Sequence, residues 1–314
     1  MATASAKTNV YSSGQMMVPE NFAEFLSTQY KTIHDGMNQV PAQGLAMYKT
    51  ANTSDDYVDS LDFVGLGTVP QNRDGDNIPF QTALQGFTNR KRPVDYRLGI
   101  AIEKRLKETG KYGLIAKIQR ALVTAGKDTI ELDAVAPFNT TFSATVPFVC
   151  ADGMNLCDTL RPREDGRGTW SNVDTSAALT ENSLEAMDNS FAGTVNGKGM
   201  LRPLAMKTLV VPRALKRKAL ELTKSSKTPE DALNSTNVYE GRFTVKVWDY
   251  LTSNTAWFGT VDMSRDEYQL EWLWRKKQGI MTWTNQPDVT KQRLRMSYVT
   301  GCDSAKGIRG NAGA

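Results

Sequence analysis

The longest regular pattern of apolar positions lies in the middle of the chain, between residues 111 and 136. Apolar or small side chains recur there at alternating steps of three and four residues, which is typical of one face of a helix. These positions are Ile115, Ile118, Leu122, Ala125, Thr129, Leu132 and Ala136. The pattern predicts a helix over about 111–135, roughly 37 Å long. We expect Pro137 to end it, because proline lacks the N–H that a helix interior needs.

The same periodicity predicts three shorter helices. Residues 19–36 carry an apolar stripe and end at a glycine. Thr180 stands where it can cap a second helix. A third helix starts at Pro212 after a short apolar strand over 206–211, since proline fits a first helical position. The apolar faces are, in order, Phe22, Phe25, Leu26, Tyr30 and Ile33; Leu184, Met187 and Phe191; and Leu215, Ala219 and Leu222.

Strand patterns dominate the last quarter of the chain. Apolar and polar residues alternate over 242–250, 267–275 and 292–300, as in half-buried strands. The segment 59–102 is rich in turn residues, and its two flanks are expected to pair as a long antiparallel ribbon reaching roughly 50 Å. A two-stranded ribbon is not stable alone in water, so it has to lie on another surface. The predicted class is α+β.

Composition narrows the class of protein only slightly. The chain has 314 residues, of which 40% are hydrophobic and 23% charged, and its net charge of +4 is mildly basic. Such a charge permits contact with nucleic acid without indicating a dedicated DNA-binding domain. No signal peptide or membrane-spanning segment is predicted. Three cysteines without an export signal predict reduced thiols in the cytosol.

Candidate motifs for catalysis or cofactor binding fail one by one. The chain has a single histidine, His34, which removes most acid–base and metal constellations. Residues 65–70 begin like a dinucleotide loop but place Pro70 at the third glycine. Residues 74–77 resemble a calcium loop, yet its required glycine and glutamate are missing. Cys150 and Cys157 lack a second ligand pair for zinc. We predict no enzyme activity, cofactor or metal, and a local hydrogen bond for Cys157 near a helix end.

Three basic clusters remain, at residues 90–92, 213–218 and 275–277. They are compatible with solvated faces, with phosphate contacts or with contacts to neighbouring subunits. We favour subunit contacts, because the clusters are scattered and lack interleaved stacking aromatics. A tryptophan on the polar side of a strand is a further interface candidate. The predicted interface residues are Arg73, Asp74, Asp76, Arg90, Lys91, Arg92, Arg213, Lys216, Arg217 and Trp248.

The order of these pieces resembles the major capsid (major head) proteins of tailed bacteriophages, particularly the Mu-like head subunits. The resemblance runs through "DFVGLGTVPQNRDGD", "QGFTNRKRPVDYRLGIAIEKRLKETGKYGLIAKIQRALVTAGKDTIELDAVAPFNTTF", "ALTENSLEAMDNSF", "LRPLAMKTLVVPRALKRKALEL" and "RLRMSYVTGCDSAKGIRG". It covers about residues 20–310, and residues 225–290 depart from it most.

The resemblance implies a Hong Kong 97-type fold. Residues 1–57 would form an N-terminal arm and amphipathic helix, and residues 58–99 an extended loop over the adjacent subunit. Residues 100–144 would hold the spine helix of a peripheral domain, and residues 145–270 an axial domain. Residues 271–314 would supply returning strands of the peripheral domain and a C-terminal tail.

The same resemblance implies a structural function. The chain would assemble in the host cytoplasm, as hexamers and pentamers, into the icosahedral head shell of a virion. The shell would enclose double-stranded DNA without sequence-specific contacts. A separate scaffolding protein and a portal would be its partners, the presence of a decoration protein is left open, and no membrane is involved. Two alternatives stay open: an encapsulin-type compartment shell, and an unrecognised enzyme.

Overall fold

The structure of the chain is a computed structural model. It describes residues 26–31, 33, 42–64, 66, 68–71, 77–78, 80, 84–109, 112–143, 150–227, 236–262, 270–286 and 289–314. The chain divides into two compact units. The first comprises residues 1–40, 96–126 and 278–296, and the second comprises residues 41–95, 127–277 and 297–314. The domain boundaries expected from the sequence stay predictions.

The first unit has a small apolar core. Residues 26–31 and 33 are helical, in agreement with the helix predicted over 19–36, whose other residues lie outside the described ranges. Leu26, Ile102 and Ile115 pack together, and α2 (Lys104–Glu108) adds Leu106 to this cluster. The side-chain amide of Gln119 donates to the Leu26 carbonyl and to Gln292 Oε1, both at 3.2 Å. These bonds satisfy the amide nitrogen of this buried side chain, whereas its Oε1 has no partner among the described residues.

The long central helix is α3 (Tyr112–Asn139), which ends later than the sequence predicts. Pro137 lies inside its last turn, so the prediction that this proline ends the helix is wrong. A proline so close to the end removes only one backbone hydrogen bond. The helix continues because Phe138 is buried at its end and packs edge-on against Trp248 and Phe258, with ring centroids 5.2 Å apart in each pair.

The buried face of α3 differs from the predicted one in its second half. Ile115 and Leu122 are buried as expected, but Leu132 is 56% exposed. The residues buried there are Ile130, Ala134, Val135 and Phe138. A repeat of three and four residues averages 3.5, whereas a straight helix has 3.6 residues per turn, so the predicted stripe drifts around the helix.

A four-stranded sheet in the second unit has the order β12-β9-β7-β8. These strands are β7 (Thr208–Val211), β8 (Thr244–Val247), β9 (Trp257–Thr260) and β12 (Ile308–Asn311). The strands β7 and β8 are parallel, and the connection between them runs through η2 (Arg213–Leu215) and α5 (Lys216–Lys224). The predicted strand, proline and helix are therefore the first part of a β-α-β crossover.

The helices α4 (Glu181–Ala192) and α5 pack with this sheet in one core. Thr180 caps α4 as predicted: its Oγ1 accepts from Ser183 N at 3.3 Å. Leu184, Met187 and Phe191 are fully buried, also as predicted. At Gly259 in β9, a Cβ would lie 2.6 Å from Met187 Sδ, so only glycine permits α4 to approach so closely. The buried members of this core are Leu179, Leu184, Met187, Phe191, Leu204, Met206, Leu209, Val211, Ala219, Leu222, Tyr239, Phe243, Trp257 and Val261.

A second sheet has the order β1-β10-β11-β4. Its strands are β1 (Lys49–Asn52), β4 (Val94–Glu103), β10 (Leu270–Gln286) and β11 (Val289–Cys302). The alternation predicted for 292–300 is confirmed at Leu294, Met296 and Tyr298, each 2% exposed. Trp272 of β10 stacks on Tyr298 with ring centroids 4.4 Å apart. Shorter elements are η1 (Gly44–Met47), β5 (Arg161–Pro162), β6 (Thr169–Trp170) and η3 (Ala305–Gly307).

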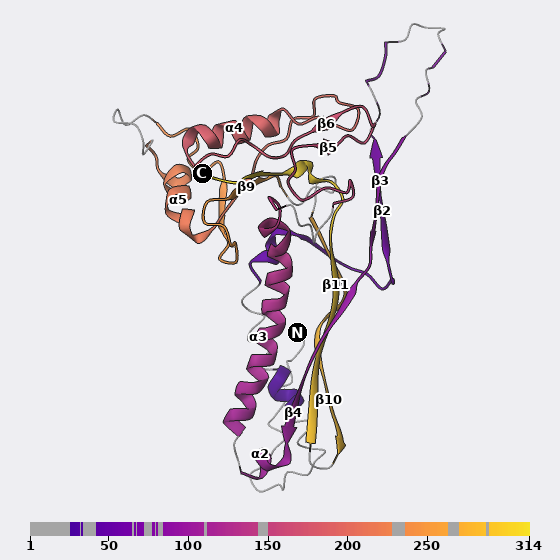
Figure 1. The fold of residues 1–314 in the computed structure, drawn as a ribbon, viewed down its shortest axis with the longest axis vertical. Helices are drawn as coiled ribbons and strands as arrows, with labels where there is room; N and C mark the ends of the chain where they lie inside the picture. Colours follow the sequence, from indigo (N-terminus) through magenta and orange to yellow (C-terminus); the bar gives the residue numbers. More distant parts are fainter. Residues whose placement is uncertain are drawn as a thin grey trace, which may run out of the picture. The chain divides into compact units, whose positions relative to one another are not determined.

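The predicted ribbon exists but is shorter than expected. The strands β2 (Val58–Val64) and β3 (Leu84–Lys91) pair antiparallel from Val58↔Lys91 to Val64↔Leu84, side by side in Figure 1. Seven residues span about 24 Å, half the predicted reach. The far flank of the predicted ribbon is β4, which belongs to the second sheet instead. Pro93 separates β3 from β4, and it cannot donate to a strand ladder.

The two leucines of α3 provide a test of its buried face. We expect Leu122→Ala to lower the free energy of unfolding by about 2–5 kcal/mol, because it opens a cavity beside a buried position. Leu132→Ala, the matched control on the exposed side, should change it by no more than about 0.5 kcal/mol. Urea denaturation of the unassembled subunit measures both. Equal losses in the two variants would contradict the burial assigned to α3.

Candidate assembly surfaces

The base of the ribbon is fixed by the buried amino group of Lys91. The Lys91 side chain is 1% exposed, although lysine is seldom buried. Its Nζ donates to Ser60 Oγ in β2 at 2.9 Å and to Asp303 Oδ2, directly after β11, at 2.6 Å. It also forms an ion pair with Glu271 of β10. One cation therefore ties the ribbon to the ends of two strands of another sheet.

Neighbouring residues complete this anchor. The Asn89 side-chain amide donates to the Cys302 carbonyl at 3.4 Å and to Asp303 Oδ1 at 3.2 Å. Gly301 lies against the methylene chain of Lys91, where a Cβ would collide with Lys91 Cδ and Cε. A buried cation is tolerated only when it is paired and hydrogen-bonded, and this arrangement meets both conditions.

Beyond the anchor, the ribbon and the loop at its end expose large apolar side chains. Their exposed fractions are 70% at Leu61, 55% at Leu66, 94% at Val69, 71% at Ile78 and 93% at Phe80. Single exposed apolar residues are normal on a protein surface, but a group of five along one projecting segment indicates a contact with another molecule.

The predicted interface residues on the ribbon differ in their exposure to solvent. Arg73, Asp74 and Asp76 lie outside the described residues. Arg90 bonds Asp59 across the ribbon through Nε and Nη2, at 2.7 and 2.8 Å, and these bonds lower the pKa of Asp59. Arg92 is exposed just after β3. Arg90 and Arg92 therefore remain accessible to a neighbour, whereas Lys91 does not.

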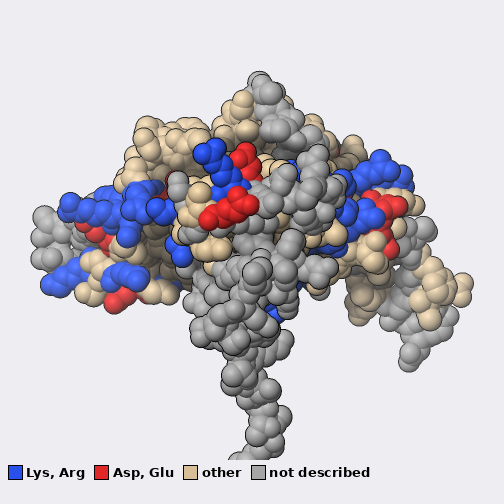
Figure 2. All heavy atoms as spheres, turned by 90° about the horizontal axis from the view of Figure 1, so that it is seen from below, with Lys and Arg blue, Asp and Glu red and all other residues tan. Residues whose placement is uncertain are grey.

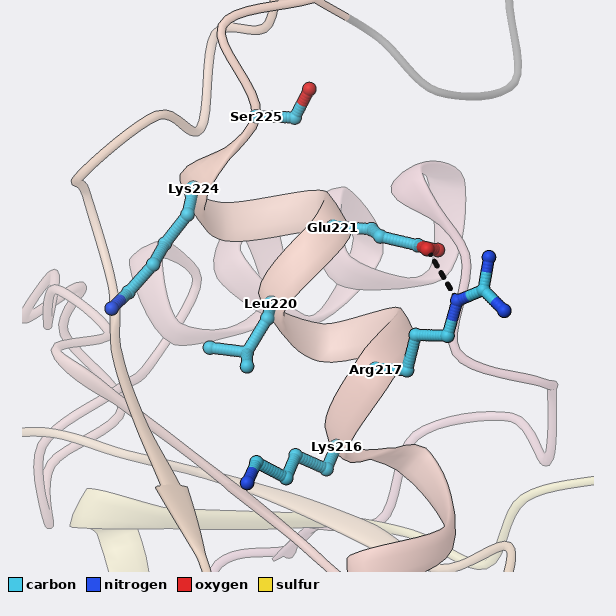
Figure 3. Close-up of a pocket in the computed structure, with 6 residues that line it drawn as sticks. All are labelled: Lys216, Arg217, Leu220, Glu221, Lys224 and Ser225. Carbon is cyan, nitrogen blue, oxygen red and sulfur yellow. Dashed lines mark hydrogen bonds and ion pairs between the residues drawn. The ribbon is translucent and has the colours of Figure 1, made fainter.

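A second candidate surface covers α5. Arg213 is 74% exposed and pairs with Asp249 at 2.7 Å, and Arg217 is 90% exposed and pairs with Glu221 at 2.7 Å. Lys216 and Lys224 project on the same side as the half-buried Leu220, over an open hollow of about 530 Å³ (Figure 3). Lys and Arg side chains gather at the left of Figure 2, the side on which Figure 1 shows α5. Arg213, Lys216 and Arg217 are thus all exposed on or just before α5, and Arg217 points to the opposite side from Lys216 (Figure 3).

Trp248 does not lie on a surface. It is 2% exposed and packs against Phe138 at the end of α3. Its place on the polar side of a predicted strand suggested an interface residue, but its ring is buried within the chain itself. The burial of Trp248 and Lys91 argues against direct contacts from either side chain to another subunit.

Metal-ligand groups and the environment of Cys157 can be examined in the described part of the chain. Within it, no group of three or more His, Cys, Asp or Glu side chains could hold a metal ion. The backbone N–H of Cys157 donates to Thr141 Oγ1 at 2.6 Å, two residues beyond α3, so the predicted bond near a helix end exists but joins residues 16 positions apart rather than local ones. Burial raises the pKa of the Cys157 thiol to about 12. None of the described helices is long and apolar enough to span a membrane.

Comparison with known proteins assigns the chain to a family. A family model described as phage capsid protein matches residues 89–310. The chain belongs to the phage capsid protein family. The match covers most of the described elements from β3 to β12. A search of the curated proteins finds no match.

Solved structures show the fold of this capsid protein. A chain from Mycobacterium phage Patience aligns with a TM-score of 0.53 and 12% identity, over 96% of this chain and 94% of that chain. A chain from Microbacterium phage Oxtober96 aligns with a TM-score of 0.51 and 9% identity, over 85% and 89%. The fold is the tailed-phage, Hong Kong 97-type capsid fold, as expected. The protein is a major capsid protein of the head shell, and its place is the virion capsid.

The ion pairs of Lys91 could not be found from the sequence. Its partners lie 31, 180 and 212 residues away along the chain. A lysine between two arginines at a strand end looks like any solvated basic cluster. The only local signal is Pro93, which stops the strand and thereby places Lys91 at the base of the ribbon.

The anchor can be tested with two substitutions in adjacent positions. Lys91→Met keeps the length of the buried chain but leaves Glu271 and Asp303 without their cation. We expect it to lower the free energy of unfolding by about 1–3 kcal/mol. Hydrogen exchange of the β2 and β3 amides should become faster, because the base of the ribbon loosens.

Arg90→Met serves as the control, since Arg90 and Asp59 are both exposed to water. It should leave the exchange of these amides almost unchanged. If both variants show the same protection along β2 and β3, the anchoring role of Lys91 is refuted.

Proposed function

We propose that this capsid protein assembles as hexamers and pentamers into an icosahedral head shell around double-stranded DNA. The observation that carries the proposal is the ribbon with its five exposed apolar side chains, held at its base by Lys91. A projecting segment of this kind is unfavourable on an isolated subunit and gains stability when it lies on a neighbour.

The ribbon suits a heterologous contact, in which one surface of a subunit meets a different surface of the next. Such contacts close into rings when the rotation between subunits fits, and they can build a shell. Burying a large apolar side chain contributes about 1.5–3 kcal/mol. A few partly buried side chains in each contact are therefore enough to hold a shell together, because every subunit makes one such contact and receives another.

The basic surface on α5 would meet a neighbouring subunit or the shell interior. Arg213, Lys216 and Arg217 are exposed, and the two arginines keep their partners within the chain. Exposed cations of this kind suit contacts that adjust between hexamers and pentamers, because they depend less on fixed geometry than packed apolar groups do. They also suit DNA without reading its sequence.

Further partners follow from the same proposal. We infer assembly in the host cytoplasm with a separate scaffolding protein and a portal, and leave the presence of a decoration protein open. The order of the pieces along the sequence supports the Mu-like subtype of head subunit. The role is structural rather than enzymatic.

Electron microscopy of the purified protein tests the function directly, first expressed alone and then with its genomic neighbours. Closed shells or rings of five and six subunits, filled with DNA in the virion, are the expected result. A small uniform shell that holds protein instead of DNA would favour the encapsulin-type alternative. A monomer under all conditions would overturn the proposal.

The ribbon contact can be tested by changing its two most exposed apolar residues. The double variant Val69→Ser, Phe80→Ser should keep the thermal midpoint of the unassembled subunit, because both side chains are more than 90% exposed. It should reduce shell yield by at least about tenfold, since each lost apolar contact costs on the order of 1 kcal/mol and is repeated at every interface.

Leu160→Ser is the matched control, because Leu160 is 65% exposed and lies beside β5, away from the ribbon in sequence. Sedimentation velocity measures the fraction of protein in shells for each variant. Normal shell yield from the double variant would show that the ribbon does not form the contact.

A further inference from the structure

Two buried cysteines from distant parts of the chain lie next to each other. Cys150 is 4% exposed and Cys302, the last residue of β11, is fully buried. Ala151 N donates to the Cys302 carbonyl at 3.0 Å, which makes the two backbones neighbours. The two side chains also influence each other's ionisation: the pKa of Cys150 is lowered and that of Cys302 is raised. Both cysteines are free, and both belong to the second compact unit.

A buried arginine lies beside this pair. Arg161 Nε and Nη2 bond Asp152 at 2.9 Å each, and Nη1 bonds the carbonyls of Asn155 and Leu156 at 2.5 and 3.0 Å. These bonds hold the guanidinium next to Cys150. The neighbouring Cys302 side chain lowers the pKa of Cys150, and the positive charge of Arg161 lowers it further, against the effect of burial. Cys150 is thus the thiol that ionises more readily.

The third cysteine has a different environment. Cys157 lies against Gly310, where a Cβ would be 2.8 Å from its Sγ, and its pKa is raised by burial. It therefore has little thiolate, the form that reacts with oxidants. The chain itself supplies a matched control for the pair.

We propose that Cys150 and Cys302 form a redox-responsive pair that closes into an intrachain disulfide when the folded protein meets hydrogen peroxide. The Cys150 thiolate attacks one peroxide oxygen and becomes a sulfenic acid, while the other oxygen leaves as hydroxide and takes up a proton as water. The Cys302 sulfur then attacks the Cys150 sulfur, loses its proton, and releases a second water. Two thiols and one peroxide give one disulfide and two waters.

The disulfide would reinforce the base of the ribbon. Cys302 directly precedes Asp303, which bonds Lys91, and its carbonyl accepts from Asn89. The bond would close a loop of roughly 150 residues, and such long loops give the largest constraint on the unfolded chain. The thiols stay reduced in a reducing cytosol and become oxidised outside it. The protein would thus be made in a looser form and become more stable after release.

The test uses the full chain, purified with reduced thiols and exposed to a small excess of hydrogen peroxide. Alkylation after denaturation, followed by mass spectrometry, counts the remaining thiols. We expect a fall from three alkylated cysteines to one, with a peptide map that links Cys150 to Cys302. The thermal midpoint should rise by roughly 5–10 °C on oxidation and return on reduction.

Three variants sharpen the result. Cys157→Ser should still lose two alkylatable thiols, whereas Cys150→Ser and Cys302→Ser should form no intrachain disulfide. The map of the unsubstituted chain decides the question even if a variant does not fold. Three alkylated cysteines after peroxide, a sulfinic acid without a link, or a link through Cys157 would each overturn the proposal.

Discussion

The burial of one lysine amino group is the constraint on which the ribbon depends. Lys91 can stay buried only while Ser60, Glu271 and Asp303 surround its Nζ, so three segments must meet at one point. An apolar side chain there would not require this meeting, because apolar packing tolerates small shifts. Paired charges instead require one arrangement of the three segments, because a buried charge that loses its partner is strongly destabilising. The base of the ribbon is therefore fixed to the ends of β10 and β11.

Local patterns revealed most elements of the fold. The cap at Thr180, the alternation in β11 and the proline before η2 each encode their element within a few residues, and the structure agrees at all three, except that Ser297 on the polar side of β11 is buried. Two predictions were wrong where distant packing decides. Phe138 is drawn into the core, so α3 continues past Pro137, and Leu132 is exposed because the burial along α3 follows its partners rather than a strict repeat.

The candidate surfaces were harder to foresee. Exposed arginines such as Arg213 and Arg217 were recognisable as basic clusters, because charge is visible in the sequence. The burial of Lys91 and Trp248 was not, because it depends on residues far away along the chain. The proximity of Cys150 and Cys302 is hidden for the same reason. Sequence spacing indicated only Cys150 and Cys157, whereas the structure brings Cys302 next to Cys150 through the Ala151–Cys302 backbone bond.

The apolar side chains along the ribbon also have a thermal consequence. Apolar association near room temperature is driven by the entropy of water, and it weakens on cooling. A shell whose subunits are joined through Val69, Ile78 and Phe80 would therefore assemble with a negative heat-capacity change and loosen in the cold. Temperature, as well as concentration, would then set how much of the protein is in shells.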